Sequence, residues 1–230
     1  MKKKERNTRT NYSVITGDII GSSLIGKKKG QLLSQLKKTF NEINAALPDA
    51  AEKPFEIFRG DSFQSVIKQP GKSVLIGILI RAKLRSITFG GTKSGSIENK
   101  LDARIAIGIG KIGFEANKVI ESDGEAFSFS GKLLDEITKE RQNLKVKTPW
   151  KDINSELDVE CYYIDTIINK WTMEQAEAAY LKLLKDETQQ LIAKKLKISQ
   201  PAVRKRIIGA NLKSIELFTG RFENLIESKL

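Results

Sequence analysis

The chain contains no histidine and a single cysteine, Cys161, among its 230 residues. The absence of histidine excludes sites in which histidine activates a serine or cysteine nucleophile, and with one cysteine it argues against a zinc site. A lone cysteine cannot form a disulfide framework, so we expect a reducing, cytoplasmic environment and a buried structural thiol. No apolar run approaches the length needed to cross a bilayer, so we expect no membrane partner. Any catalysis must use carboxylates, Lys or Arg, hydroxyls, backbone amides and a hard metal ion.

Positive charge is in excess: 40 Lys and Arg residues against 28 Asp and Glu residues give a formal net charge of +12. This balance fits a polyanionic partner such as nucleic acid, although an ordinary basic soluble protein has it too. The length is enough for one sizeable core and a small appended domain. The basic residues at the start of the chain predict a disordered tail over residues 1–11.

Residues 12–168 carry strand and helix patterns in alternation. We predict strands over 12–20, 103–110, 144–147 and 159–164, a hairpin over 55–67, and helices over 31–47, 71–88 and from 124 onward. Pro48 and Pro54 are expected to bracket a loop, and residues 90–96 are expected to form a flexible loop. The order β-α-β-β-α-β-α-β predicts an α+β fold, a ferredoxin-like palm with helices on one face of the sheet.

Asp18 and Asp61 each follow an apolar, strand-like run that breaks at a glycine. Asp18 lies in Thr16-Gly17-Asp18-Ile19-Ile20-Gly21-Ser22-Ser23, and Asp61 lies at the expected hairpin tip, in Phe58-Arg59-Gly60-Asp61-Ser62-Phe63. A carboxylate at a strand end or hairpin tip can be reached by a divalent cation that carries phosphates. We therefore predict that both aspartates bind Mg²⁺ or Mn²⁺. The alternative is that each aspartate only caps a helix or bonds its own backbone.

Over residues 12–165 the chain resembles the class III nucleotide cyclases. The combination of motifs in the chain also looks like that of the SatD-type bacterial proteins. The resemblance lies in four segments that occur in the family's order: Asp18-Ile19-Ile20-Gly21-Ser22, Gly60-Asp61-Ser62-Phe63, Arg104 to Gly110, and Gly124 to Leu134. It implies a head-to-tail homodimer in which Asp18 and Asp61 hold metal ions against a nucleoside triphosphate. It also implies phosphate binding by the backbone amides of Ile19, Ile20, Gly21 and Ser22, which we expect in a turn that leads into a helix.

The chain departs from the cyclase pattern where the family stabilises the transition state. An Asn and an Arg of the family correspond to Ser128 and Lys132, which are our candidate catalytic residues. Lysine keeps the charge but loses the bidentate fork that matches a phosphoryl group, and both residues also fit an ordinary solvated helix face. The base-reading Lys of the family corresponds to Ile57 and its partner approximately to Glu121. The resemblance therefore supports metal and phosphate binding but not cyclisation.

Residues 169–230 predict a small all-α helix-turn-helix domain, similar to those of response regulators and sigma factors. We expect Thr172 to cap a helix, a second helix over 189–196, a turn over 197–199, and a third helix over 200–208 capped by Ser199. The side chains left to contact DNA are Lys194, Lys195, Ser199, Gln200, Ala202, Arg204, Lys205 and Arg206. The alternative is a three-helix bundle for protein contacts. The last helix, over 212–225, either closes that bundle or forms a dimer seam.

Taken together, these features predict a cytoplasmic, homodimeric DNA-binding regulator. Its N-terminal region would sense a nucleoside triphosphate or another nucleotide through Asp18, Asp61 and Mg²⁺ or Mn²⁺. Two alternatives stay open. The first is an active nucleotidyl cyclase that converts a nucleoside triphosphate to a cyclic nucleotide and pyrophosphate and carries a DNA-binding domain. The second is a scaffold whose palm region only dimerises.

Overall fold

The structure, a computed structural model, describes residues 11–22, 26, 28–58, 60–88, 101–114, 119 and 123–230. The first part of the chain forms β1 (Tyr12–Ile20), α1 (Lys29–Ala46), β2 (Ala51–Phe58), β3 (Ser62–Ile67), the short turn η2 (Pro70–Lys72), α2 (Ser73–Ser86), β4 (Asp102–Gly110), β5 (Ile112–Phe114), β6 (Asp123–Gly124), α3 (Glu125–Glu140), β7 (Leu144–Lys147) and α4 (Lys151–Asn169). Apart from residue 11, the predicted tail lies outside the described residues, and so does the predicted loop 90–96.

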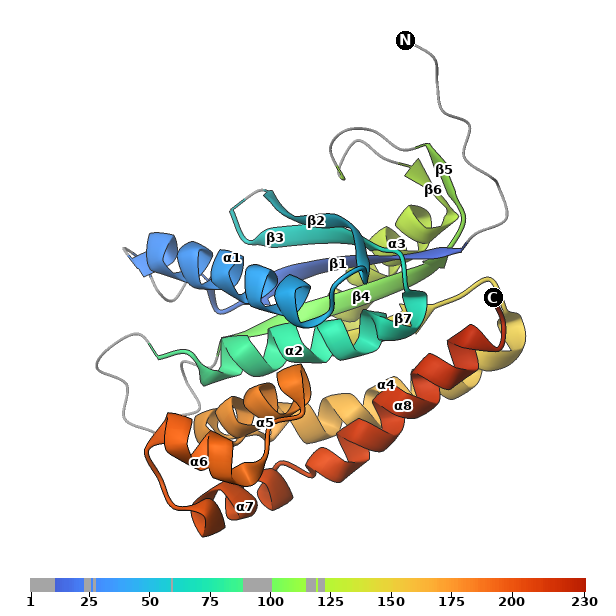
Figure 1. Cartoon of the computed structure of the whole chain (residues 1–230). Coiled ribbons are helices and arrows are strands. Elements are labelled where there is room, and N and C mark those ends of the chain that lie inside the picture. Colours follow the sequence, from blue (N-terminus) through green and yellow to red (C-terminus); the bar gives the residue numbers. More distant parts are fainter. Residues whose placement is uncertain are drawn as a thin grey trace.

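A five-stranded sheet in the order β2-β3-β1-β4-β7 forms the centre of the molecule (Figure 1). The strand β1 lies between β3 and β4 and is antiparallel to both, whereas β7 runs parallel to β4. This arrangement confirms the α+β class and the split β-α-β order expected of a ferredoxin-like sheet. The predicted hairpin is confirmed as β2 and β3, with Gly60 at a φ of 83° in the turn.

The sequence predicts that Pro54 ends a loop, but in the structure Pro54 lies within β2. It is tolerated there because β2 is an edge strand, where a missing N–H leaves no ladder hydrogen bond unmade. The pairing of β2 with β3 shifts register on either side of Lys53, next to this proline.

Helices cover both faces of the sheet, whereas the sequence pattern predicts helices on one face only. Strand β4 shows the reason, because its side chains alternate between two buried environments. Ile105 and Ile107 face α2, where a Cβ added to Gly77 would lie 2.8 Å from Ile105. Gly108 faces α3 so closely that a Cβ there would lie 2.2 Å from the carbonyl oxygen of Ala126. A central strand that is buried on both faces needs helices on both sides.

The predicted strand over 159–164 is wrong, since these residues lie within α4. The run contains Val159, Tyr162 and Tyr163, which favour strands by propensity, and all three are exposed. The buried residues of this helix recur at helical spacing, namely Ile153, Asn154, Leu157, Cys161, Ile164, Asp165 and Ile168. Helical periodicity of the buried face therefore outweighed local propensity. Cys161 is fully buried, as predicted, and burial raises the pKa of its thiol.

The C-terminal helices are α5 (Met173–Lys185), α6 (Gln189–Leu196), α7 (Gln200–Gly209) and α8 (Leu212–Glu227). Thr172 forms a capping box with Gln175, and Ser199 accepts the backbone N–H of Ala202, so both predicted caps are confirmed. Among the described residues, no helix is long and apolar enough to span a membrane.

A distinct helix-turn-helix domain is not shown, because residues on both sides of position 169 share one core. Trp171, Ala179 and Tyr180 belong to the same buried cluster as residues of α2 and the sheet. In Figure 1, α2 lies between the sheet and α5. The division into residues 12–168 and 169–230 stays a prediction.

Helix α8 packs against both the C-terminal helices and the rest of the fold, and whether it also takes part in a dimer stays a prediction. Its phased side chains Ile215, Phe218 and Phe222 enter the main core of the same chain. The helix approaches η2 so closely that a Cβ added to Gly71 would lie 3.2 Å from the Cα atom of Glu223. Its apolar face is thus occupied within one chain.

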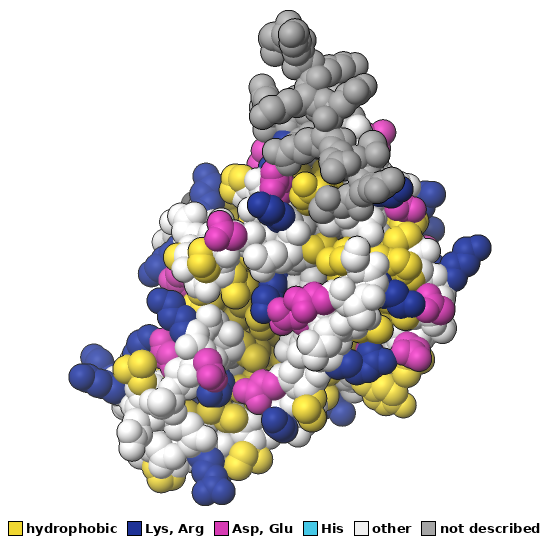
Figure 2. All heavy atoms as spheres, turned by 45° about the vertical axis from the view of Figure 1, so that its right-hand side comes forward, with side chains coloured by type: hydrophobic (Ala, Val, Ile, Leu, Met, Phe, Trp, Pro, Cys, Tyr) yellow, Lys and Arg dark blue, Asp and Glu magenta, His cyan; other side chains and the backbone are white. Residues whose placement is uncertain are grey.

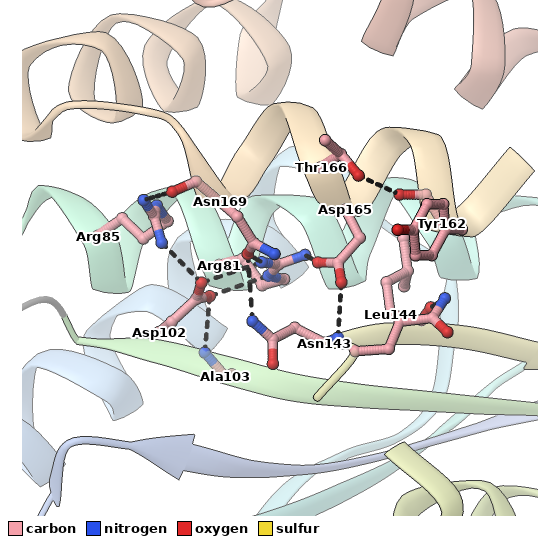
Figure 3. Close-up of polar contacts among 11 residues, drawn as sticks. Arg81, Arg85, Asp102, Ala103, Asn143, Leu144, Tyr162, Asp165, Thr166 and Asn169 are labelled. Carbon is pink, nitrogen blue, oxygen red and sulfur yellow. Dashed lines mark hydrogen bonds and ion pairs between the residues drawn. The ribbon is translucent and has the colours of Figure 1, made fainter. Parts of the chain in front are cut away.

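A buried cluster of ionised side chains joins α2, β4 and α4 (Figure 3). We call it the arginine cluster; it consists of Arg81, Arg85, Asp102 and Asp165. Arg81 is fully buried and donates to both oxygens of Asp102, at 2.9 Å each, and to Asp165 at 2.6 Å. Burial by itself opposes ionisation of Asp102, but the two guanidinium groups outweigh it and lower the pKa of this carboxyl.

The arginine cluster also fixes the junction between α4 and α5. One Nη of Arg85 donates to the carbonyl oxygens of Asn169 and Trp171, at 2.8 and 2.9 Å. The indole N–H of Trp171 donates in turn to the carbonyl oxygen of Ala210, at the end of α7, at 2.8 Å. A continuous chain of contacts therefore connects β4 with the end of α7.

We predict that Arg81→Met lowers the free energy of unfolding by about 3–5 kcal/mol. The substitution leaves the buried carboxylate of Asp165 without its guanidinium, and Asp102 keeps only Arg85. Urea denaturation followed by circular dichroism measures the change.

Arg221→Met is the matched control, because Arg221 pairs with Glu156 and Glu160 on the surface of α4. Exposed pairs contribute little, and we expect a loss below about 1 kcal/mol. Equal losses for Arg81→Met and Arg221→Met would show that burial of the cluster has no special role.

We also predict that Gly17→Ala destabilises the protein by about 1–3 kcal/mol, through overpacking. A Cβ at Gly17 would lie 2.5 Å from the ring of Phe63 and 2.7 Å from the backbone oxygen of Arg104. Gly131→Ala on α3 is the control, since no atom of the described residues lies within 4 Å of its Cβ position. At position 131, alanine should stabilise the protein by about 0.5–1 kcal/mol because of its higher helix propensity. Thermal melting of both variants measures the result: the melting temperature should fall for Gly17→Ala and rise for Gly131→Ala.

Candidate functional site

Asp18 and Asp61 lie at the same end of two neighbouring strands. In the ladder between β1 and β3, Asp18 stands opposite Ser62, the residue that follows Asp61. The backbone N–H of Ile19 donates to the backbone oxygen of Asp61 at 3.1 Å. The fold therefore places Asp18 and Asp61, which are 43 positions apart in the sequence, at adjoining strand ends. We call Asp18 and Asp61 the carboxylate pair.

Each member of the carboxylate pair is held by a side chain rather than by its own backbone. Asp18 accepts a hydrogen bond through Oδ2 from Nη1 of Arg104 at 2.8 Å, and its Oδ1 is buried with no partner among the described residues. Asp61 accepts a hydrogen bond through Oδ2 from the hydroxyl of Ser22 at 2.8 Å. Neither contact is the helix cap or backbone turn that was the structural alternative for these aspartates.

The pairing of Asp18 with Arg104 was not predicted. Arg104 belongs to a segment that we singled out for its resemblance to a cyclase strand, but its partner depends on strand register. Asp18 and Arg104 stand directly opposite each other in the ladder between β1 and β4. Residues directly opposite in an antiparallel pair share a face, and this is the signal that a correct strand alignment would have supplied.

The predicted phosphate-binding turn differs from expectation in two respects. The N–H of Ile19 is taken by Asp61, so Ile19 does not offer this amide to a phosphate. Helix α1 begins at Lys29, so Ile20, Gly21 and Ser22 do not form its first turn. These three residues stay predicted phosphate contacts, and Gly21 has a φ of 82°.

A lysine lies over the hairpin tip beside the carboxylate pair. The Nζ atom of Lys29 would be 3.1 Å from a Cβ added to Gly60. Lys29 is the first residue of α1, and no side chain caps that helix end within the described residues. The site therefore combines two carboxylates with the cations Arg104 and Lys29.

The candidate catalytic residues Ser128 and Lys132 are exposed on α3. Within the part of the chain that the structure describes, no hydrogen bond or ion pair links either residue to the carboxylate pair. Their helix does reach β1 through Ser130, whose hydroxyl accepts a hydrogen bond from Thr16 at 3.0 Å. Gln64 of β3 donates to the same Thr16 hydroxyl at 2.8 Å. This polar chain was not predicted from the sequence.

The donor atoms of the carboxylate pair fit Mg²⁺ or Mn²⁺, although no metal site is shown. Among the described residues there is no group of three or more His, Cys, Asp or Glu side chains that could hold a metal ion. Mg²⁺ commonly uses one or two carboxylates, with substrate phosphates and water as the remaining ligands. The buried, unpartnered Oδ1 of Asp18 is a ready oxygen ligand.

Of the two positions that correspond to base recognition in cyclases, the structure describes only Ile57, whose side chain is apolar. Ile57 is half-buried and packs against the main core. Glu121 lies outside the described residues.

Helices α6 and α7 are joined by the turn Lys197-Ile198-Ser199, with Lys197 at a φ of 53°. A small separate cluster of Ile192, Ala193 and Val203 packs the two helices together. The residues predicted to contact DNA are exposed, except that Ala202 and Arg206 are half-buried; the exposed ones are Lys194, Lys195, Ser199, Gln200, Arg204 and Lys205.

Several of these side chains have partners within the chain. Lys195 pairs with Glu187, Arg206 with Glu177 at 3.4 Å, and Gln200 with Gln189 at 2.6 Å. Among the described residues, Lys194, Arg204 and Lys205 have no such partner, and they are the cations most available to an external anion.

Comparison with solved structures finds distant likenesses to nucleotide cyclases. A bacterial light-regulated adenylyl cyclase is 14% identical, with a TM-score of 0.40 over 60% of this chain and 42% of that one. The GGEEF domain of a diguanylate cyclase from Vibrio cholerae is 15% identical, with a TM-score of 0.41 over 62% of this chain and 85% of that one. The guanylyl cyclase Cya2 is 14% identical, with a TM-score of 0.38 over 55% of this chain and 70% of that one. With TM-scores below 0.5, these likenesses do not bear on the function of this chain.

None of the curated proteins matches the chain. The model of the SatD family matches residues 12–221, from the first residue of β1 into α8, and so includes both the carboxylate pair and the C-terminal helices. The chain therefore belongs to the SatD family.

Proposed function

We propose that this protein is a DNA-binding regulator that senses a nucleotide. Its sheet binds a nucleoside triphosphate or other nucleotide, together with Mg²⁺ or Mn²⁺, through Asp18 and Asp61. The observation that supports this proposal is the position of Asp18 and Asp61 at adjoining strand ends, with one buried oxygen of Asp18 unpartnered among the described residues. A buried carboxylate oxygen without a partner is costly, and a metal–phosphate complex would satisfy it.

The cations around the carboxylate pair support a phosphorylated ligand. Lys29 lies beside Gly60 at the hairpin tip, and Arg104 contacts Asp18. A bound divalent ion would bridge phosphate oxygens and neutralise their charge. The residues of the chain would then hold the phosphates in place, with the amides of Ile20, Gly21 and Ser22 as further donors.

We propose binding without cyclisation. The side chains at the transition-state positions are Ser128 and Lys132, both exposed on α3. Lysine lacks the planar fork by which arginine holds a phosphoryl group with two hydrogen bonds. Formation of a cyclic nucleotide and pyrophosphate would instead assign the protein to the cyclases.

The α6–α7 pair supports the proposal of DNA binding. A short turn and a helix capped by Ser199 project Arg204 and Lys205 outward, as in helices that enter the major groove. Figure 2 shows that Lys and Arg side chains are interspersed with Asp and Glu side chains on the face it presents. We propose that the exposed cations of α6 and α7, Lys194, Arg204 and Lys205, carry the contact with DNA.

We further propose that the protein acts as a homodimer in the cytoplasm and that nucleotide binding changes its affinity for DNA. One chain presents one α7 helix, and paired half-sites are read by dimers. The contacts from Arg85 through Trp171 to Ala210 offer a route by which a change at β4 reaches the end of α7.

We predict that nucleoside triphosphate with Mg²⁺ raises the melting temperature of the wild-type protein and that Asp18→Asn and Asp61→Asn abolish the rise. Binding to the folded state alone stabilises it by about 2.7 kcal/mol at a hundredfold excess over the dissociation constant. Asp135→Asn, an exposed acid of α3, is the matched control and should keep the full rise.

The same samples are analysed by chromatography for cyclic nucleotide and pyrophosphate. A cyclic nucleotide that the wild type makes and Asp18→Asn does not make would favour the alternative of an active nucleotidyl cyclase. No shift with any of the four triphosphates and no product would contradict nucleotide sensing.

We predict that Arg204→Ala and Lys205→Ala each weaken binding to duplex DNA and reduce the slope of log affinity against log salt by about one, because each removes one phosphate contact. Lys213→Ala changes the same charge on the exposed side of α8 and should leave the slope unchanged. Fluorescence anisotropy with a labelled duplex at several salt concentrations measures the affinity and its dependence on salt. If all three substitutions weaken binding equally, the DNA is attracted by the net charge of the protein and not by a contact surface on α7.

A further inference from the structure

Three large apolar or aromatic side chains lie exposed on α4. Val159, Tyr162 and Tyr163 are 56%, 62% and 65% exposed. Residues of these types are poorer helix formers than alanine or leucine, and at these positions they gain no burial in return. The fold of a single chain therefore gives no reason for them, whereas a contiguous exposed apolar patch is typical of an interaction surface.

These side chains belong to an uncharged stripe on the outer side of α4. We call it the α4 stripe; it consists of Ser155, Val159, Tyr162, Tyr163 and Thr166. The rings of Tyr162 and Tyr163 meet edge to face, with their centroids 6.2 Å apart. The hydroxyl of Thr166 donates to the backbone oxygen of Tyr162 at 2.9 Å, as Figure 3 shows. The stripe can therefore be covered without taking a charge or an unsatisfied threonine hydroxyl out of water.

The area of the α4 stripe suits a protein partner. At about 200 Å² for an aromatic side chain, Tyr162 and Tyr163 expose roughly 250 Å² on each chain. Two chains that cover each other's tyrosines would bury roughly 500 Å² through these residues alone, and stable interfaces begin at about 1,200 Å² in total. Tyrosine is also among the residues that contribute most to binding at protein interfaces.

The spacing of the stripe fits a second copy of the same helix. Ser155, Val159, Tyr162 and Thr166 follow one another at intervals of four, three and four residues, as in a helix–helix seam. The intervals are the same when the sequence is read backwards. An antiparallel second copy would therefore set Val159 opposite the partner's Tyr162, and Ser155 opposite the partner's Thr166. Larger side chains would meet at the centre and small ones at both ends, about a two-fold axis.

The charges beside the α4 stripe favour the antiparallel arrangement. The exposed acids Asp152, Glu156 and Asp158 all lie in the first half of α4, and the exposed cation Lys170 follows its last residue. A reversed second helix places Lys170 beside the partner's Asp152, which is 63% exposed where it pairs with Lys229 of its own chain. A parallel pair would instead set the acids of one copy against the same acids of the other.

We propose that two copies of this chain pair through the α4 stripe, with their α4 helices antiparallel about a two-fold axis. This inference rests on the proposed homodimer and names its surface. The carboxylate pair lies on the sheet and not on α4, so the pairing needs no nucleotide.

Sedimentation velocity of the full chain without nucleotide, over a range of protein concentrations, tests the proposal. The wild type should sediment as a dimer that dissociates on dilution. Loss of one tyrosine hot spot weakens binding by about thirtyfold, and a symmetric dimer loses two, so Tyr162→Glu should raise the dissociation constant about a thousandfold. Leu217→Glu on α8 is the matched control, because Leu217 is also 62% exposed, and it should leave the dissociation constant unchanged.

A charge exchange tests the antiparallel arrangement. Lys170→Glu should weaken the dimer about tenfold, because each copy then sets a carboxylate beside the partner's Asp152. Asp152→Lys should weaken it similarly, and the double variant Asp152→Lys/Lys170→Glu should regain most of the wild-type affinity. Failure of the double variant to regain affinity would overturn the arrangement, since a general effect of either substitution would add and not cancel.

Circular dichroism melting curves establish that each variant is folded, and if Tyr162→Glu does not fold, the charge exchange decides. A wild-type dimer that Tyr162→Glu leaves intact, or that Leu217→Glu weakens equally, overturns the α4 stripe as the interface while the homodimer stands. A wild type that stays monomeric at every concentration overturns both this inference and the proposed homodimer. Nucleotide binding is measured separately by the melting temperature, so its failure would not be mistaken for either result.

Discussion

The buried arginine cluster is the constraint on which the arrangement of the molecule depends. Arg81 is surrounded by two carboxylates and an asparagine, and each of its three nitrogens donates to at least one of them. Burying these charges would be very unfavourable unless α2, β4 and α4 all stood in their observed places. The cluster therefore fixes where α4 ends, and through Arg85 it fixes the junction from which the C-terminal helices start.

This constraint has a bearing on function because β4 belongs both to the cluster and to the candidate site. Asp102, at the start of β4, is held by the cluster, and Arg104, two residues later, holds Asp18. The nucleotide site that we propose thus lies next to a rigid buried network rather than on a loose loop. The network continues to Trp171 and the end of α7, so the region proposed to bind DNA is held to the rest of the fold by packed helices and not tethered by a flexible linker.

Much of the fold followed from local patterns. Glycines and alternating apolar residues located β1, the hairpin and β4, and the capping residues Thr172 and Ser199 located two helices. Over residues 159–164, residue propensity wrongly predicted a strand, because the exposed side chains are aromatic or β-branched. The buried side chains of this segment have helical spacing, and the segment is part of α4. Propensity failed for Pro54 as well, because only the sheet order reveals that β2 is an edge strand.

For the site, the sequence by itself determined the residue types and their likeness to a known family. The lack of histidine restricted the chemistry, and Asp18 and Asp61 stood out because each breaks an apolar run at a glycine. Only the tertiary structure decided which groups meet. Strand register paired Asp18 with Arg104, and packing turned the apolar face of α8 inward, because both depend on contacts between residues far apart in the chain.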